Sequence, residues 1–163
     1  MVDRMDAYSL FYTENRERLY AYLLHMTGDG QLAADLVQES FLRYLARYGK
    51  NKGSRPLLYR IARNAALDAA RRPEAVGDVP ESSRSPIPDP ERQTVEREAF
   101  NRVLAALDQL PAAERDVLSL VVWGGMPYRE IASVLKISEA NVKVRVHRAR
   151  NRLRAALDTV ASV

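Results

Sequence analysis

Residues 128–154, YREIASVLKISEANVKVRVHRARNRLR, place the tightest limit on what this chain can fold into. Ile131, Ala132 and Leu135 form a short apolar stripe at helical spacing, and residues 136–138 interrupt it. Ser138 is a good N-cap for a second helix, whose apolar side chains again share one face: Val142, Val146, Ala149 and Leu153. A short helix and a longer cationic helix joined by a tight turn predict a helix-turn-helix.

The opposite face of the second helix is polar and basic. It carries Ala140, Val144, His147, Arg148 and Asn151, flanked by Asn141 and Lys143. This pattern alone leaves two interpretations open. The helix either recognises DNA or is a solvated surface helix that is rich in arginine.

The charge of the chain is gathered in blocks, although its net value is only +4. Residues 43–72 carry nine Lys and Arg against one Asp, and residues 139–163 carry six against two acidic residues. Residues 1–42 and 73–98 each have a net charge of −4. Two separated basic blocks predict two contacts with a polyanion.

Several classes of function are excluded or disfavoured by composition. The chain has no cysteine, which excludes disulfides and cysteine catalysis, and its two histidines, His25 and His147, are isolated. It contains no phosphate-binding glycine loop and no metal-ligand cluster. We therefore expect no enzyme activity, cofactor, metal or small-molecule substrate. Since no apolar run approaches the roughly 18 residues of a membrane span, and no signal peptide is evident, we expect a cytoplasmic protein without membrane insertion.

The first half of the chain predicts three helices. The first covers residues 5–26, and a Gly-Asp-Gly break separates it from a second over residues 31–48, with Asp29 as a candidate cap. Ser54 is the candidate cap of the third. The core side of the second helix comprises Ala33, Val37, Phe41, Tyr44, Leu45 and Tyr48, and that of the third comprises Leu58, Ile61, Ala62, Ala65 and Ala69.

A second stripe on the helix over residues 31–48 mixes leucines with carboxylates. It consists of Leu32, Asp35, Leu36 and Glu39. Composition alone fits either a solvated acidic face or a docking surface for a basic partner.

The third helix is expected to present a cationic side opposite its apolar stripe. Arg60, Arg63, Asn64 and Arg71 gather there, beside a polar loop that holds Lys50, Asn51 and Lys52. Arginine and asparagine near a lysine-rich loop suit phosphate contacts and hydrogen bonds to base edges. The alternative is a surface helix whose arginines only keep it soluble.

Residues 73–90 hold five prolines and no apolar periodicity, which predicts an extended acidic linker. Beyond it, Phe100, Val103, Leu104 and Leu107 mark a helix, and residues 112–123 mark another; both are expected to build a core for the helix-turn-helix, with Trp123 inside it. The sequence therefore predicts an all-α fold with two small helical domains, residues 1–73 and 95–163, joined by a flexible acidic proline-rich linker over residues 74–94.

Two segments of the first half, DLVQESFLRYL and LLYRIARNAALDAARR, resemble region 2 of the extracytoplasmic-function (ECF) group of bacterial RNA polymerase sigma-70-family sigma factors. Residues 128–154, led by residues 110–125, resemble region 4 of the same family. The resemblance covers nearly the whole chain in the right order. It implies a sigma region 2-like helical bundle and a region 4-like helix-turn-helix, in a subunit that binds core polymerase and directs promoter-specific transcription initiation.

The resemblance also implies a role for each surface. Docking on the β′ clamp helices of the polymerase falls to Asp35, Leu36, Gln38 and Glu39, and the β flap is the expected contact of the second domain. Single-stranded −10 DNA falls to Lys50, Asn51, Lys52, Arg60, Arg63 and Asn64. Duplex −35 DNA falls to Asn141, Lys143, Val144, Arg145, His147 and Arg148, with Arg148 the first choice for a guanine contact. An anti-sigma factor is the further partner implied.

The chain departs from the family pattern at positions that bear on promoter choice. Ser54 and Leu57 stand where the family usually has an aromatic residue and then tryptophan, so the −10 strand is expected to be captured differently. Val144 points outward on the DNA side and predicts contact with a thymine methyl group. Pro127 replaces the usual serine cap of the helix that begins at Tyr128.

Other interpretations compete with a sigma factor. A sigma-mimic protein would titrate an anti-sigma factor without binding promoters, but the two cationic helix faces argue against a pure decoy. A helix-turn-helix repressor with an N-terminal partner-binding domain is disfavoured by the pairing of DLVQE with YRIARN. An enzyme has the least support, for the reasons of composition given above.

Overall fold

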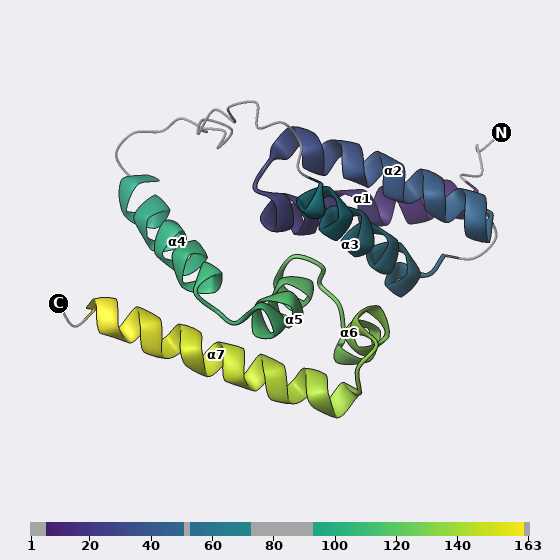
Figure 1. The fold of residues 1–163 in the computed structure, drawn as a ribbon. Coiled ribbons are helices and arrows are strands. Elements are labelled where there is room, and N and C mark those ends of the chain that lie inside the picture. Colours follow the sequence, from purple (N-terminus) through teal and green to yellow (C-terminus); the bar gives the residue numbers. More distant parts are fainter. Residues whose placement is uncertain (1–5, 51–52, 73–92, 162–163) are drawn as a thin grey trace.

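The computed structural model describes residues 6–50, 53–72 and 93–161, in which there are seven helices and no strand (Figure 1). The helices are α1 (Ala7–Thr27), α2 (Gly30–Tyr48), α3 (Arg55–Arg71), α4 (Gln93–Asp108), α5 (Ala112–Val122), α6 (Tyr128–Leu135) and α7 (Glu139–Ala161). The expected all-α class is confirmed. Most of the expected linker, residues 73–92, lies outside the described residues.

The N-termini of α2, α3 and α7 are fixed by the caps that the sequence predicts. The carboxylate of Asp29 accepts hydrogen bonds from the backbone N–H groups of Gln31 and Leu32, at 3.0 and 3.2 Å. The hydroxyl of Ser54 accepts from Leu57 and that of Ser138 from the backbone of Asn141. Each satisfies an N–H group that has no partner within its own helix. At Pro127 no side chain caps α6.

Helices α1, α2 and α3 form a bundle whose core is unusually rich in aromatic side chains. Tyr22, Phe41, Tyr44 and Tyr59 are all fully buried or nearly so, together with leucines and alanines from the three helices. The core sides predicted for α2 and α3 are confirmed at Ala33, Val37, Phe41, Tyr44, Leu58, Ala62 and Ala65.

Helices α6 and α7 form the predicted helix-turn-helix. The turn passes through Lys136, whose φ of 54° is left-handed and ends α6. On α7, Val142, Val146 and Ala149 are fully buried, as the apolar stripe predicts. Helix α5 packs against both α6 and α7, and α4 packs against α7.

Helix α4 does not bury all the apolar residues that its sequence offers. Leu107 lies in a small cluster with Leu118 and Ala149, but Phe100 is 59 % exposed and Val95 is exposed as well. The expectation that Phe100 builds the core was therefore wrong, because α4 packs mainly on α7 and the side that carries Phe100 is left exposed.

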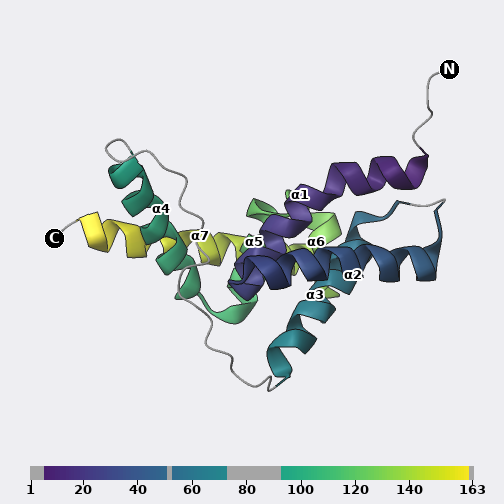
Figure 2. The same cartoon turned by 90° about the horizontal axis from the view of Figure 1, so that it is seen from above.

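The two halves of the molecule are packed against each other. One hydrophobic cluster runs from α1, α2 and α3 into α5, α6 and α7, and α3 lies directly against α6. Figure 1 shows α5 and α6 between the first three helices and α7, and the view from above in Figure 2 shows α4 at the end of the molecule away from α1. The α3–α6 contact brings the basic side of α3 against the C-terminal half.

Candidate functional site

The exposed side of α2 carries three of the four residues expected to dock on a partner. Asp35 and Gln38 are exposed and Glu39 is half-buried, whereas Leu36 is only 4 % exposed. Leu36 belongs to the core because it lies beside Ala33, Val37 and Ser40, which face α1 and α3. Its side chain therefore supports the acidic stripe from beneath and is not part of the surface.

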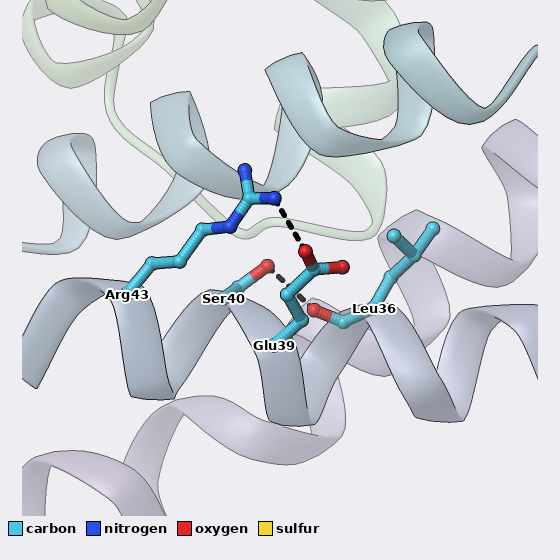
Figure 3. A network of polar contacts seen from close by, with 4 residues as sticks. All are labelled: Leu36, Glu39, Ser40 and Arg43. Carbon is cyan, nitrogen blue, oxygen red and sulfur yellow. Dashed lines mark hydrogen bonds and ion pairs between the residues drawn. The ribbon is translucent and has the colours of Figure 1, made fainter.

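Figure 3 shows how this stretch of α2 is organised around Glu39. The carboxylate of Glu39 pairs with Arg43 one turn later, and the hydroxyl of Ser40 donates to the carbonyl of Leu36 at 2.6 Å. Gln38 is oriented by its own contact, since its amide donates to the Tyr12 hydroxyl at 3.2 Å. Because the Glu39–Arg43 pair lies on the surface, it contributes no more than ~1 kcal/mol, and a partner can displace it.

A residue that the sequence argument missed extends this stripe. Leu42 is 66 % exposed, and it lies three and seven residues beyond Glu39 and Asp35, on the same face of α2. The signal was present in the sequence: an apolar residue continues the i, i+3, i+4, i+7 series of the acidic stripe. The exposed face of α2 that carries Asp35 and Glu39 thus contains Leu42 and not Leu36.

The cationic side of α3 is divided between solvent and protein. Lys50 and Asn64 are exposed, while Asn51 and Lys52 lie outside the described residues. Arg60 and Arg63 are half-buried against the C-terminal half, and the Nε atom of each is buried without a hydrogen-bond partner in the described part of the chain. The expectation of one open cationic face on α3 was therefore wrong for these two arginines.

Three polar contacts join α3 to the helices opposite. Arg63 pairs with Asp116 of α5 at 2.8 Å, and Arg55 pairs with Glu130 of α6 at 2.7 Å. Arg60 donates to the backbone carbonyl of Ser133 in α6. The four paired side chains are only 21–30 % exposed, so solvent screens these pairs less than a typical surface pair.

Apolar and aromatic contacts lie beside these pairs. His25 of α1 stacks on Trp123, with ring centroids 4.0 Å apart and ring planes 14° from parallel. Burial lowers the pKa of His25, an effect that Asp108 opposes and Arg115 reinforces. Trp123 is thus shared between the two halves, and is not simply a core residue of the second domain.

The turn after α5 contains two glycines where it packs against α1 and α3. Gly125 has a φ of 60°, and a Cβ atom placed there would lie 1.5 Å from Nη1 of Arg18 in α1. A Cβ at Gly124 would come within 3.3 Å of the Tyr59 ring. Glycine at both positions lets the turn approach the first three helices closely.

Two buried tyrosines lie under the same interface. The rings of Tyr22 and Tyr59 are 5.4 Å apart, and neither hydroxyl has a hydrogen-bond partner among the described residues. Burial raises the pKa of both phenols well above the ordinary value of 10.0. Both therefore stay neutral, and they act as packing residues.

The outward face of α7 is open. Lys143, His147 and Arg148 are exposed and Val144 is 47 % exposed, opposite the buried stripe. Asn141 and Arg145 are half-buried, and the Asn141 side chain accepts a hydrogen bond from Nε of Arg145 at 3.1 Å. All six side chains expected to meet −35 DNA thus lie at or near the surface of α7.

Further along α7, Arg152 is held by protein. It pairs with Glu114 of α5 at 3.0 Å, and the Glu114 side chain is only 9 % exposed. Arg150 and Arg154 remain exposed. Arg152 therefore helps to fix α7 on α5, and Arg150 is the better candidate for a phosphate contact.

In the described part of the chain, no three His, Cys, Asp or Glu side chains are grouped so that they could hold a metal ion. No helix found there is both long enough and apolar enough to cross a membrane.

Comparison with known proteins agrees with this arrangement. Residues 11–75 match the family Sigma-70 region 2, and residues 100–153 match Sigma-70, region 4. The ECF RNA polymerase sigma factor SigM of Bacillus subtilis is 32% identical over 145 residues, covering 84% of this chain and 86% of the relative. SigL of Mycobacterium tuberculosis, also an ECF sigma factor, is 33% identical over 152 residues, with 90% and 86% covered.

Solved structures show the same fold. The sigma factor RpoE of Bartonella quintana, in complex with the anti-sigma factor NepR, superposes with a TM-score of 0.65 at 24% identity, covering 91% of this chain and 92% of that one. CnrH, in complex with the cytosolic domain of CnrY, superposes with a TM-score of 0.62 at 22% identity, with 94% and 99% covered. With sigma region 2 on α1–α3 and region 4 on α4–α7, the chain belongs to the ECF group of RNA polymerase sigma factors.

Proposed function

We propose that this chain binds core RNA polymerase and directs it to promoters through two DNA contacts, one on α3 and one on α7. The observation that carries the proposal is the outward face of α7, where lysine, valine, histidine and arginine side chains are exposed over a fully buried stripe. A helix with this division suits the major groove of duplex DNA.

The −35 contact falls to that face. Arg148 and Lys143 are free to reach base edges or phosphates, and Val144 offers an apolar surface to a thymine methyl group. Arg145 is oriented by Asn141, so the two act together near the start of α7. His147 is steadied by Asn151 at 3.2 Å.

Core polymerase docks on α2. Asp35, Gln38 and Glu39 supply polar contacts to the β′ clamp helices, and Leu42 supplies the apolar one, while Leu36 holds the stripe in position from within the core. An exposed leucine beside carboxylates is the composition of a surface that meets a basic partner with an apolar centre.

The −10 strand is assigned to α3 and the loop before it. Lys50 and Asn64 are exposed and can contact the single strand, and Asn51 and Lys52 belong to the same loop in the sequence. Arg60 and Arg63 join them once they leave their contacts with α5 and α6. Cations and amides of this kind bind the backbone and edges of unstacked bases.

The remaining assignments follow from this function. Residues 1–73 act as the polymerase and −10 domain, and residues 95–163 act as the −35 domain, which meets the β flap. An anti-sigma factor is the expected inhibitor, acting in the cytoplasm where the polymerase works.

Run-off transcription with core polymerase and a pool of genomic promoters tests the proposal. We expect promoter-specific transcripts with the wild-type chain. Asp35→Ala with Glu39→Ala is expected to weaken core binding by roughly tenfold and to leave duplex DNA binding unchanged, since α2 is remote from α7. Glu14→Ala with Glu17→Ala is the matched control, because it removes two exposed carboxylates from α1.

Two outcomes would contradict the proposal. Equal loss of core binding in the α2 variant and the α1 control would refute docking on α2. Absence of promoter-specific transcripts, together with tight binding to an anti-sigma factor, would identify a sigma mimic.

A further inference from the structure

Two of the α3 residues that are assigned to single-stranded DNA, Arg60 and Arg63, already have partners inside the protein. Arg63 is paired with Asp116, and Arg60 donates to the carbonyl of Ser133. One turn before Arg60, Arg55 is paired with Glu130. These partners come from α5 and α6, in the half of the chain that carries the −35 contact.

The chemistry of these partners matches that of a nucleic acid backbone. Two carboxylates and a carbonyl oxygen present anionic or electron-rich oxygens to three guanidinium groups, as phosphates and base edges would. Asp116 holds one Nη of the Arg63 guanidinium at 2.8 Å, and it partly neutralises a charge that a phosphate would otherwise meet alone. Helix α6 also packs against α3 and covers this side of it.

The −35 surface is not affected by the same arrangement. Lys143, Val144, His147 and Arg148 stay exposed while α3 is covered, because α7 meets α5 and α6 through its opposite side. The outward face of α7 is thus exposed in the closed chain, whereas Arg60 and Arg63 of α3 are engaged by α6 and α5.

We propose that Asp116, Glu130 and Ser133 form an internal competitor for the DNA strand on α3. In the closed chain, duplex DNA binds α7 freely, and single-stranded DNA binds α3 only after α5 and α6 have moved away. The identity of the strand as −10 DNA rests on the function proposed above, but the competition itself does not.

Uncharged contacts also hold the two halves together, so the removal of one carboxylate need not separate them. His25 on Trp123 and Tyr59 beside Gly124 hold the halves together without charge. Removing a carboxylate from the interface should therefore shift the balance between closed and open chains without separating the halves outright.

The test uses the full chain with Asp116→Asn, Glu130→Gln and the double variant. Two probes are compared, a fluorescent single strand of about 20 mixed-sequence nucleotides and a duplex of the same length. We expect single-strand affinity to rise roughly fivefold for each single variant and more than tenfold for the double variant, and duplex affinity to change by less than about twofold.

Loss of a negative charge would by itself favour DNA binding, so a charge control is needed. Asp68→Asn removes an exposed carboxylate from α3 that forms no ion pair with the C-terminal half in the described part of the chain. If the interface variants gain no more single-strand affinity than Asp68→Asn, or gain equally for the duplex, the competitor does not exist.

A covalent lock tests the same inference from the other direction. Because the chain has no cysteine, Arg55→Cys with Glu130→Cys gives a single pair of thiols, which a short bismaleimide can bridge. The bridged chain should lose at least about tenfold in single-strand affinity and retain duplex affinity, relative to the same variant with its thiols capped. Unchanged single-strand binding after bridging would overturn the proposal.

The outcomes separate this inference from the proposed function. Both DNA probes are used without polymerase, so the competition is measured even if the chain directs no transcription. Conversely, a chain that transcribes from specific promoters but shows no response to these variants keeps its function and lacks the competitor.

Discussion

Helices α3 and α7 are both cationic and both amphipathic, yet the structure treats them in opposite ways. Helix α7 buries one stripe and leaves its basic face in solvent, whereas α3 is packed on two sides, by α1 and α2 on one and by α6 on the other. The difference comes from what stands opposite: Asp116 and Glu130 face α3, and no helix covers the outward face of α7 in the described residues. A basic helix face is therefore not by itself an open one.

The largest effect is expected where α3 is covered on both sides. Tyr59→Ala removes a fully buried ring that lies between Tyr22 and the turn at Gly124, and should lower the free energy of unfolding by about 3–5 kcal/mol. Val144→Ala, on the open face of α7, should change it by less than about 0.5 kcal/mol. Urea denaturation of the two variants measures the difference.

Tyr59→Phe sharpens that result. The Tyr59 hydroxyl is buried and has no partner among the described residues, so its removal should be neutral or slightly stabilising. A loss as large as that of Tyr59→Ala would show that the hydroxyl, and not the ring, holds this interface.

On α7 the expected effect is smaller and concerns selectivity. Arg148→Ala should relax the preference for one −35 base pair by about 1–3 kcal/mol, since a bidentate arginine contact to guanine is worth that much. Arg150→Ala should weaken all duplex sequences alike and reduce the salt dependence of binding by about one phosphate contact. Binding titrations over a set of single-base variants and salt concentrations make the comparison, and identical profiles for the two variants would contradict this division.

The smallest expected effect is the response of the interface to pH. The pKa of His25 lies below its ordinary value of 6.5 in the closed chain, because burial against Trp123 disfavours the charged ring. The closed arrangement is therefore fully stable above that value and loses stability as pH falls below it, since the open chain takes up the proton more readily. Asp108 and Arg115, the charged groups that act on His25, change the size of this effect and not its sign.

A distance measurement between the halves reads out the pH effect. Dyes on Ala46→Cys and Arg129→Cys, both exposed positions, report separation by energy transfer. Transfer should decrease as pH falls to about one unit below the ordinary histidine value, and His25→Gln should abolish that decrease. A pH response that survives in His25→Gln would assign it to another group.

The sequence predicted the helices and their caps well because both depend on residues that are close together in the chain. Asp29, Ser54 and Ser138 cap the helices as expected, and the buried stripe of α7 follows from spacing alone. The contact between the halves has no such signature. Glu130 lies 75 residues from Arg55, and nothing within either helix indicates that they meet.

The errors in the candidate sites have the same origin. Arg60 and Arg63 do lie opposite the apolar stripe of α3, but spacing on one helix cannot show that another helix covers them. Leu36 was assigned to the docking surface by the family resemblance and by its place in the acidic stripe, although it is buried with Ala33, Val37 and Ser40. In both cases the sequence predicted the helix correctly but did not show which other helices pack against it.

The turn at Gly125 limits how this protein could be re-engineered. A side chain there would require a strained left-handed backbone and would displace the flexible end of Arg18, so a C-terminal half grafted from a relative fits best when it brings glycine at this position. Such chimaeras would also have to carry acidic residues that match Arg55 and Arg63. Promoter choice is therefore better altered by exchanging the outward side chains of α7, which leaves the packing of the two halves intact.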